Sequence, residues 1–144
     1  MVKVRWVVTI GVVLALGASS VAQQEAARGV SRVCSNRTLF GDYGTLIEGS
    51  FLANNWSLRT TSMMHFDGRG NVTTSDYVVL NGTPLSEDWA PKTGTYSVNP
   101  NCTATFTLEG VMVIKTHFTV VNGGMDIRGV VDGDAITFAG SRVR

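Results

Sequence analysis

The amino-acid sequence predicts an all-β fold, a closed antiparallel up-and-down barrel of about eight strands with one disulfide. Two observations carry most of this prediction. Apolar and polar residues alternate with a period of two over long stretches, and turn signals divide the chain at regular intervals. The third observation is a lone pair of cysteines, Cys34 and Cys102. No stretch after the N-terminal segment has the periodicity of an amphipathic helix.

Residues 1–22 have the layout of a secretory signal peptide. Two cations, Lys3 and Arg5, precede an apolar run, and small residues follow at 20–22. The apolar run is shorter than the roughly 20 residues of a membrane-spanning helix. We therefore expect cleavage before Gln23 and a mature protein that is secreted or periplasmic and has no membrane span.

The mature chain is expected to form one domain. Residues 23–33 are polar and alanine-rich without an apolar face, which predicts a disordered lead-in to a β-barrel domain at 34–144. The chain has 12 basic and 11 acidic residues. Loss of the two leader cations leaves ten against eleven, a formal charge of −1. Because no basic field remains, nucleic acid is not an expected partner.

The first three expected strands are 42–52, 59–66 and 71–80. In the first, alternate residues from Tyr43 to Phe51 form one set, and the residues between them form a more polar set. Turn residues at Asn54-Asn55 and at 67–71 separate the three segments. Short connections of this kind favour antiparallel hairpins.

The remaining expected strands are 93–98, 102–109, 111–121, 125–131 and 135–143. In the third of these, Ile114, Thr116 and Phe118 alternate with Lys115 and His117. Clusters of Asn, Gly, Pro or Asp at 81–84, 99–101, 122–124 and 132–134 supply the turns. Such a meander can remove its own edges by closing into a barrel.

The glycine-rich stretch from Asp67 to Asn71 could be a metal loop, a phosphate loop or a hairpin tip. A calcium loop fails because its third position is Arg69 and its twelfth is Val78. A phosphate loop requires a following helix, whereas a strand pattern follows Asn71. The two glycines can supply positive φ angles, so the sequence predicts a hairpin tip with an exposed Arg69.

The two cysteines are interpreted as one disulfide, Cys34 to Cys102. Both lie in the exported part of the chain, where the compartment is oxidising. For so long a loop the chain-entropy estimate of the stabilisation is roughly 4 kcal/mol. The alternative, a reactive thiol pair, is weaker because the C-x-x-C spacing is absent.

The sequence predicts no catalytic residue, no metal site and no cofactor. His65 and His117 lie on strand faces opposite the better apolar sets, so both are expected in solvent. Neither has a second histidine at metal-ligand spacing. No G-x-S-x-G nucleophile elbow occurs.

Two motifs carry a resemblance to a known group. F-D-G-x-G-N-V at 66–72 and G-T-Y-x-V-N-P-x-C at 94–102 resemble small exported bacterial proteins of unassigned activity. That group is similar to the allene oxide cyclase-type barrel, which is related in shape to lipocalins. The likeness spans most of the mature chain and implies this fold. Such cyclases hold a long apolar substrate inside the barrel, so the resemblance implies that a ligand would lie there.

The apolar faces of the expected strands converge on the barrel interior. An eight-stranded interior is filled by side chains or holds one small ligand, and the sequence leaves both open. The candidate ligand-binding wall is Met64, Phe66, Tyr77, Phe106, Ile114, Phe118, Phe138 and Arg142. Tyr43, Tyr77 and Arg142 are the polar groups expected to orient a ligand.

Three classes of function follow from the predicted barrel and its interior. The first is an exported carrier that binds a small apolar ligand inside the barrel. The second is a cyclase or isomerase of the allene oxide cyclase type, for which Glu48 and Arg142 are the candidate perturbed interior groups. The third is a non-catalytic secreted scaffold or interaction protein, which predicts an exposed apolar patch.

Overall fold

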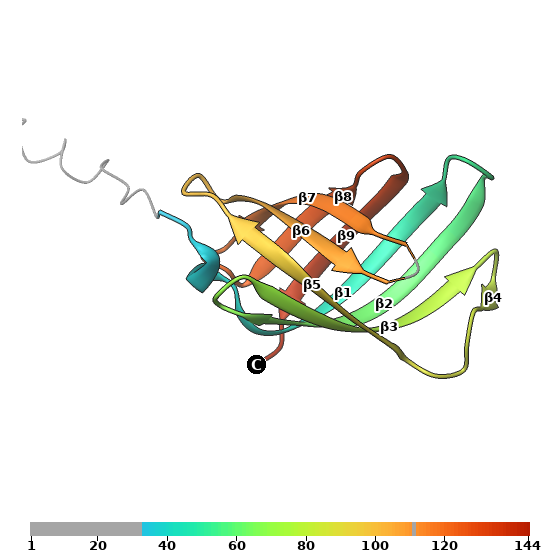
Figure 1. The fold of residues 1–144 in the computed structure, drawn as a ribbon, viewed down its shortest axis with the longest axis horizontal. Coiled ribbons are helices and arrows are strands. Elements are labelled where there is room, and N and C mark those ends of the chain that lie inside the picture. Colours follow the sequence, from blue (N-terminus) through green and yellow to red (C-terminus); the bar gives the residue numbers. More distant parts are fainter. Residues whose placement is uncertain (1–32, 111) are drawn as a thin grey trace, which may run out of the picture. The chain divides into compact units, whose positions relative to one another are not determined.

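The computed structural model describes residues 33–110 and 112–144, and it is all β apart from one short helical turn (Figure 1). The expected signal peptide at 1–22 and nearly all of the lead-in at 23–33 lie outside the described residues. The elements are the 3-10 helix η1 (Asn36–Thr38) and the strands β1 (Phe40–Phe51), β2 (Trp56–Asp67), β3 (Asn71–Leu80), β4 (Thr83–Pro84), β5 (Ala90–Val98), β6 (Thr103–Glu109), β7 (Ile114–Val121), β8 (Asp126–Val131) and β9 (Ala135–Arg142).

Eight of the strands close into an antiparallel barrel, which confirms the predicted fold class. The hydrogen-bonded order is β2-β1-β9-β8-β7-β6-β5-β3, and an additional pairing of β2 with β3 completes the circle. Each barrel strand pairs with the barrel strands before and after it in sequence, as expected for a meander, and β1 pairs with β9. Closure leaves the barrel strands without a free edge along their paired lengths.

The ends of the eight predicted strands differ from the observed ends by at most three residues. A ninth strand, β4, lies within the predicted turn at 81–84. Asn81 (φ 49°) and Gly82 (φ 82°) form a two-residue turn, and the chain after them pairs back with the end of β3. Positive φ at both central positions gives a turn whose twist matches that of the flanking strands.

The barrel has two distinct ends. The end that carries η1 also has the turns at 67–71, 99–102 and 122–125 and the end of β9. We call the opposite end, with the connections at 52–55, 81–89, 110–113 and 132–134, the distal end; described connections of that end lie together at the right in Figure 1.

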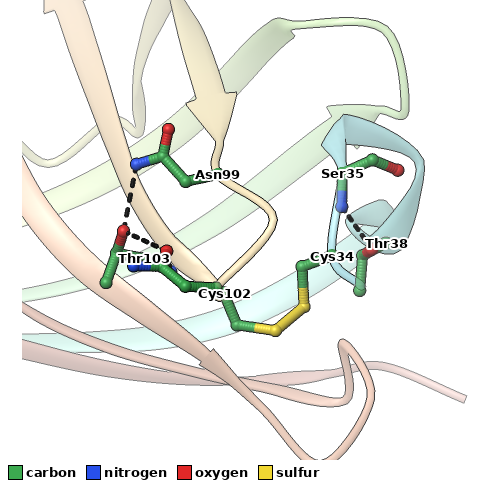
Figure 2. The surroundings of a disulfide bond; sticks show 7 residues. Cys34, Ser35, Thr38, Asn99, Cys102 and Thr103 are labelled. Atoms are coloured by element: carbon green, nitrogen blue, oxygen red, sulfur yellow. Dashed lines mark hydrogen bonds between the residues drawn. A yellow bond between two sulfur atoms is a disulfide. The ribbon is translucent and has the colours of Figure 1, made fainter. Parts of the chain in front are cut away.

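The Cys34–Cys102 disulfide is present and fastens the η1 segment to the β5–β6 turn (Figure 2). The side-chain oxygen of Asn36 accepts a hydrogen bond from the Val98 amide at 2.8 Å. The Tyr96 hydroxyl lies 2.9 Å and 3.1 Å from the carbonyl oxygens of Asn36 and Leu39. Burial raises the pKa of Tyr96 to about 12, so its hydroxyl remains a donor at neutral pH.

The predicted hairpin tip is confirmed at Asp67 to Asn71. One Asp67 carboxylate oxygen accepts the backbone N–H groups of Arg69, Gly70 and Asn71 at 2.7 to 3.0 Å. The other accepts the Asn71 side-chain amide at 2.6 Å. Gly68 (φ 75°) and Gly70 (φ 119°) both have the expected positive φ, and Arg69 is exposed.

Candidate functional site

Aromatic rings fill much of the barrel interior. Tyr43, Phe66 and Tyr96 stack edge to face, with ring centroids 5.2 and 5.0 Å apart. A second set of rings from β6, β7 and β9 has centroids 5.4 to 6.0 Å apart. These distances are those of packed aromatic cores, in which each ring contributes both buried area and ring-to-ring contact.

Six predicted wall residues lie in this interior. Met64, Phe66, Phe106, Phe118 and Phe138 are buried, and Ile114 is half-buried against the same core. The rings contact one another, so they contribute to the stability of the barrel whether or not a ligand binds. Their part in ligand binding stays a prediction.

Tyr77 does not line the interior, and this prediction is wrong. On β3 the buried positions are Val72, Thr74 and Asp76, so Tyr77 points outward. Its ring packs against Trp89, with centroids 5.9 Å apart. The error has a physical reason: both faces of β3 mix polar and apolar residues, since Val72, Val78 and Leu80 share the inward face with Thr74 and Asp76, so hydrophobicity alone does not distinguish them.

Glu48 and Arg142 also lie away from the centre of the interior. Glu48 is on the outer face, where a carboxylate oxygen is 3.4 Å from Nε of Arg59. Arg142 has an inward register position at the η1 end, half-buried, with its guanidinium carbon 6.0 Å from the ring centroid of Phe40. Neither residue is in place to act on a ligand in the middle of the barrel.

A polar face that sequence reasoning missed lies inside the barrel on four neighbouring strands. Its members are Thr45 of β1, Thr60 and Ser62 of β2, Thr74 and Asp76 of β3, and Lys92 of β5. Ser62 is opposite both Thr45 and Asp76, and Thr74 is opposite Lys92. Direct cross-strand neighbours have Cβ atoms about 4.5 to 5.5 Å apart, so the register gathers these side chains into one patch.

Asp76 is the centre of the polar face. One carboxylate oxygen is 2.5 Å from Oγ of Ser62, and the other is 2.5 Å from Nζ of Lys92. The side chain of Asp76 is 5% exposed and that of Lys92 is 24% exposed. A buried carboxylate is tolerated when it is paired and hydrogen-bonded, and both conditions hold here.

Two buried hydroxyls on the polar face have no partner. Oγ1 of Thr60 and Oγ1 of Thr74 make no hydrogen bond to any described residue, although the residues are only 4% and 5% exposed. In contrast, the hydroxyls of Thr45 and Thr116 donate to backbone carbonyl oxygens at 3.2 and 3.3 Å. An unsatisfied buried hydroxyl costs about 1 to 3 kcal/mol, so this pair requires an explanation.

One sequence signal could have revealed the polar face. Phe66 pairs with Val72 across the hairpin tip. Because directly paired residues lie on the same face of a sheet, Val72 points inward as Phe66 does. Counting in steps of two from Val72 gives Thr74 and Asp76 as the next inward residues. Tyr77 and Val79 belong to the alternate, outward set, and the turn geometry distinguishes the two sets where hydrophobicity does not.

The two histidines lie in solvent, as predicted. His65 and His117 are exposed, and Nδ1 of each lies 2.7 Å from a carboxylate oxygen, of Asp42 and Asp132 respectively. Within the described ranges no group of three or more His, Cys, Asp or Glu residues could hold a metal ion.

A groove of about 360 Å³ lies over β1, β8 and β9, lined mainly by outward-facing residues. Small residues such as Gly44, Ala139 and Ser141 form part of it, and Leu46 and Arg128 also line it. It contains neither of the unpartnered hydroxyls, so it gives less reason to expect a ligand than the polar face does.

Comparison with protein-family models, curated proteins and solved structures found no match to this chain. Among the residues that the structure describes, no helix is long and apolar enough to span a membrane.

Proposed function

We propose that this protein is an exported binding protein whose barrel holds one small amphipathic molecule, with the polar group of that molecule against the polar face. The observation that carries the proposal is the pair of buried, unpartnered hydroxyls of Thr60 and Thr74, which flank Ser62 and Asp76. A ligand with hydrogen-bonding groups would satisfy them.

Export is supported by two features of the chain. Residues 1–22 have the cation, apolar run and small-residue order of a signal peptide. The Cys34–Cys102 disulfide is typical of proteins that fold in an oxidising compartment.

The chemistry of the polar face selects the ligand class. Hydroxyls, a carboxylate and an ammonium group recognise alcohols, amides or similar polar groups through hydrogen bonds. The neighbouring inward residues on the same strands, Ile47, Leu58 and Met64, offer contacts to an apolar part of the ligand. The sequence predicts a small apolar ligand, and the polar face changes this expectation to an amphipathic one.

The resemblance to allene oxide cyclase-type barrels agrees with an interior location for the ligand. The resemblance supports a location for the ligand, and it assigns no catalytic role to any residue of this chain. Few precisely placed polar groups within an otherwise apolar wall are what small-molecule sites generally have.

Native mass spectrometry tests the proposal with protein purified from the exported fraction of its own host. We expect a complex whose mass exceeds that of the polypeptide by the mass of one lipid-sized or smaller molecule. A mass equal to that of the polypeptide alone would contradict the proposal.

Variants then test the location. Thr60→Val and Thr74→Val keep the side-chain shape and remove the hydroxyl, so each should lower the fraction of protein that carries the ligand. Thr116→Val is the matched control, because the Thr116 hydroxyl already donates to the Phe106 carbonyl oxygen. Equal occupancy in all three variants would place the ligand elsewhere.

A further inference from the structure

Six large apolar side chains are exposed on or directly beside three connections at the distal end. They are Leu52, Trp56, Leu85, Trp89, Met112 and Val113, each between 47% and 66% exposed, and we call them the distal rim. Both tryptophans of the described residues belong to this set. Trp and Met are enriched at protein interfaces, and exposed apolar groups gathered at one end of a molecule mark interaction surfaces.

The distal end is also acidic. Six carboxylates lie on its outer face and connections: Glu48, Glu87, Asp88, Glu109, Asp132 and Asp134. Two cations, Arg59 and Lys115, lie on the outer face of the same end. The six carboxylates therefore exceed the cations there by four charges. Inside the barrel, Asp76 and Lys92 cancel one another. The η1 end has the opposite balance, with five arginines against three aspartates among the described residues.

Four of these carboxylates, Glu87, Asp88, Glu109 and Asp134, form no ion pair with any described residue. Glu87 and Asp88 lie between Leu85 and Trp89 on the same connection. Apolar and anionic groups are therefore interleaved on this part of the rim.

We propose that the distal rim docks a basic, amphipathic polypeptide segment of a partner protein. The apolar side chains of such a segment would cover the rim, and its cations would lie against the surrounding carboxylates. This inference is independent of the proposed ligand inside the barrel, because it uses exposed residues that do not belong to the polar face.

The charge distribution favours a basic polypeptide over an anionic membrane surface. Four excess negative charges repel anionic lipid head groups, whereas they attract lysine and arginine side chains. The rim residues are also spread over three separate connections, which suits an extended partner better than one small molecule.

A pair of synthetic peptides tests the proposal. The first is an 18-residue amphipathic peptide of leucine and lysine, and the second replaces every lysine with glutamate. Binding to the mature full-length protein is measured by fluorescence anisotropy of the labelled peptides. We expect the lysine peptide to bind at least about tenfold more tightly, and its affinity to fall with added salt.

Variants at the two ends locate the binding surface. Trp56→Ser with Leu85→Ser, and separately Glu87→Lys with Asp88→Lys, should each weaken binding of the lysine peptide by at least about fivefold. Val143→Ser and Arg69→Glu at the η1 end are the matched controls and should bind as the wild type does. Circular dichroism of each variant serves to check that it is folded.

Three outcomes would overturn the proposal. The first is equal affinity for the two peptides, and the second is unchanged affinity in the folded rim variants. The third is binding to vesicles of phosphatidylcholine or phosphatidylglycerol without binding to the lysine peptide, which would make the rim a membrane-contact surface instead.

Discussion

At the scale of single residues, the hydroxyls of Thr60 and Thr74 are unfavourable for the unliganded fold. Because each is buried without a partner, removing it while keeping the shape should stabilise the protein. We expect Thr74→Val to raise the free energy of unfolding by about 1 kcal/mol in urea denaturation of ligand-free protein.

The Thr116→Val variant is the control for that prediction. Its hydroxyl has a carbonyl partner, so its removal should lower the free energy of unfolding by about 1 kcal/mol. If Thr74→Val destabilises the protein as much as Thr116→Val does, the Thr74 hydroxyl has a partner in the native protein.

Asp67 gives a prediction about pH. Hydrogen bonds from the Asn71 side chain and from backbone N–H groups lower the pKa of Asp67 from 3.8 to about 2. Because the folded pKa is below the unfolded value, the stabilisation is present above pH 3.8 and is lost as pH falls toward 2. The melting temperature of Asp67→Asn should thus be lower than that of the wild type at pH 7, and the difference should shrink between pH 4 and pH 2. A constant difference would contradict this assignment.

The residue scale is also where prediction from sequence was weakest. Alternating apolar residues such as Phe66 and Phe138 identify the apolar interior, but hydrophobicity does not identify an inward face that mixes polar and apolar residues. Thr74 and Asp76 were missed for this reason, and Tyr77 was placed inside with Val79, although Val78 and Leu80 are the apolar residues of the inward set. Only the pairing register between β2 and β3 resolves the two faces.

At the scale of elements, the strands and turns were predictable because local chemistry determines them. Period-two alternation and turns rich in Gly and Asn require no knowledge of tertiary contacts. β4 is the exception, because a strand of two residues is too short to produce an alternation. Its existence depends on the turn at Asn81-Gly82 that precedes it.

The β2–β3 hairpin tip yields a prediction at this scale. A Cβ atom at residue 70 would lie 3.2 Å from the Asn36 side-chain nitrogen and 3.3 Å from the Tyr96 carbonyl oxygen, at a φ of 119°. Gly70→Ala should therefore destabilise the protein by about 1 to 3 kcal/mol in urea denaturation. Arg69→Ala is the control at the exposed tip and should change the free energy of unfolding by less than about 0.5 kcal/mol. Equal effects would mean that the backbone at residue 70 relaxes freely.

At the scale of the whole molecule, the two ends of the barrel are built differently. The η1 end is closed by a disulfide, buried tyrosines and the hairpin tip and exposes three large apolar residues, whereas the distal end exposes the six residues of the rim and has an excess of carboxylates. The sequence predicted the barrel and the disulfide, since both follow from local patterns and a lone cysteine pair. The sequence could not predict the difference between the two ends. That difference arises only when barrel closure brings connections that are distant in sequence to the same end.

The disulfide provides the last prediction, because it acts on the whole molecule and on one end of it. Replacing both Cys34 and Cys102 with alanine frees a loop between residues 68 apart in sequence, and by chain entropy this should lower the free energy of unfolding by about 4 kcal/mol. In the native state the loss should be local: the Val98 amide, which donates to Asn36, should exchange its hydrogen faster than in the wild type. Backbone amides in the middle of β2 and β3, far from η1, should be accelerated only through global unfolding. Hydrogen exchange under native conditions separates the two effects. If all protected amides accelerate by the same factor, the disulfide stabilises the protein only through the unfolded chain, and the η1 segment stays attached to the barrel without it.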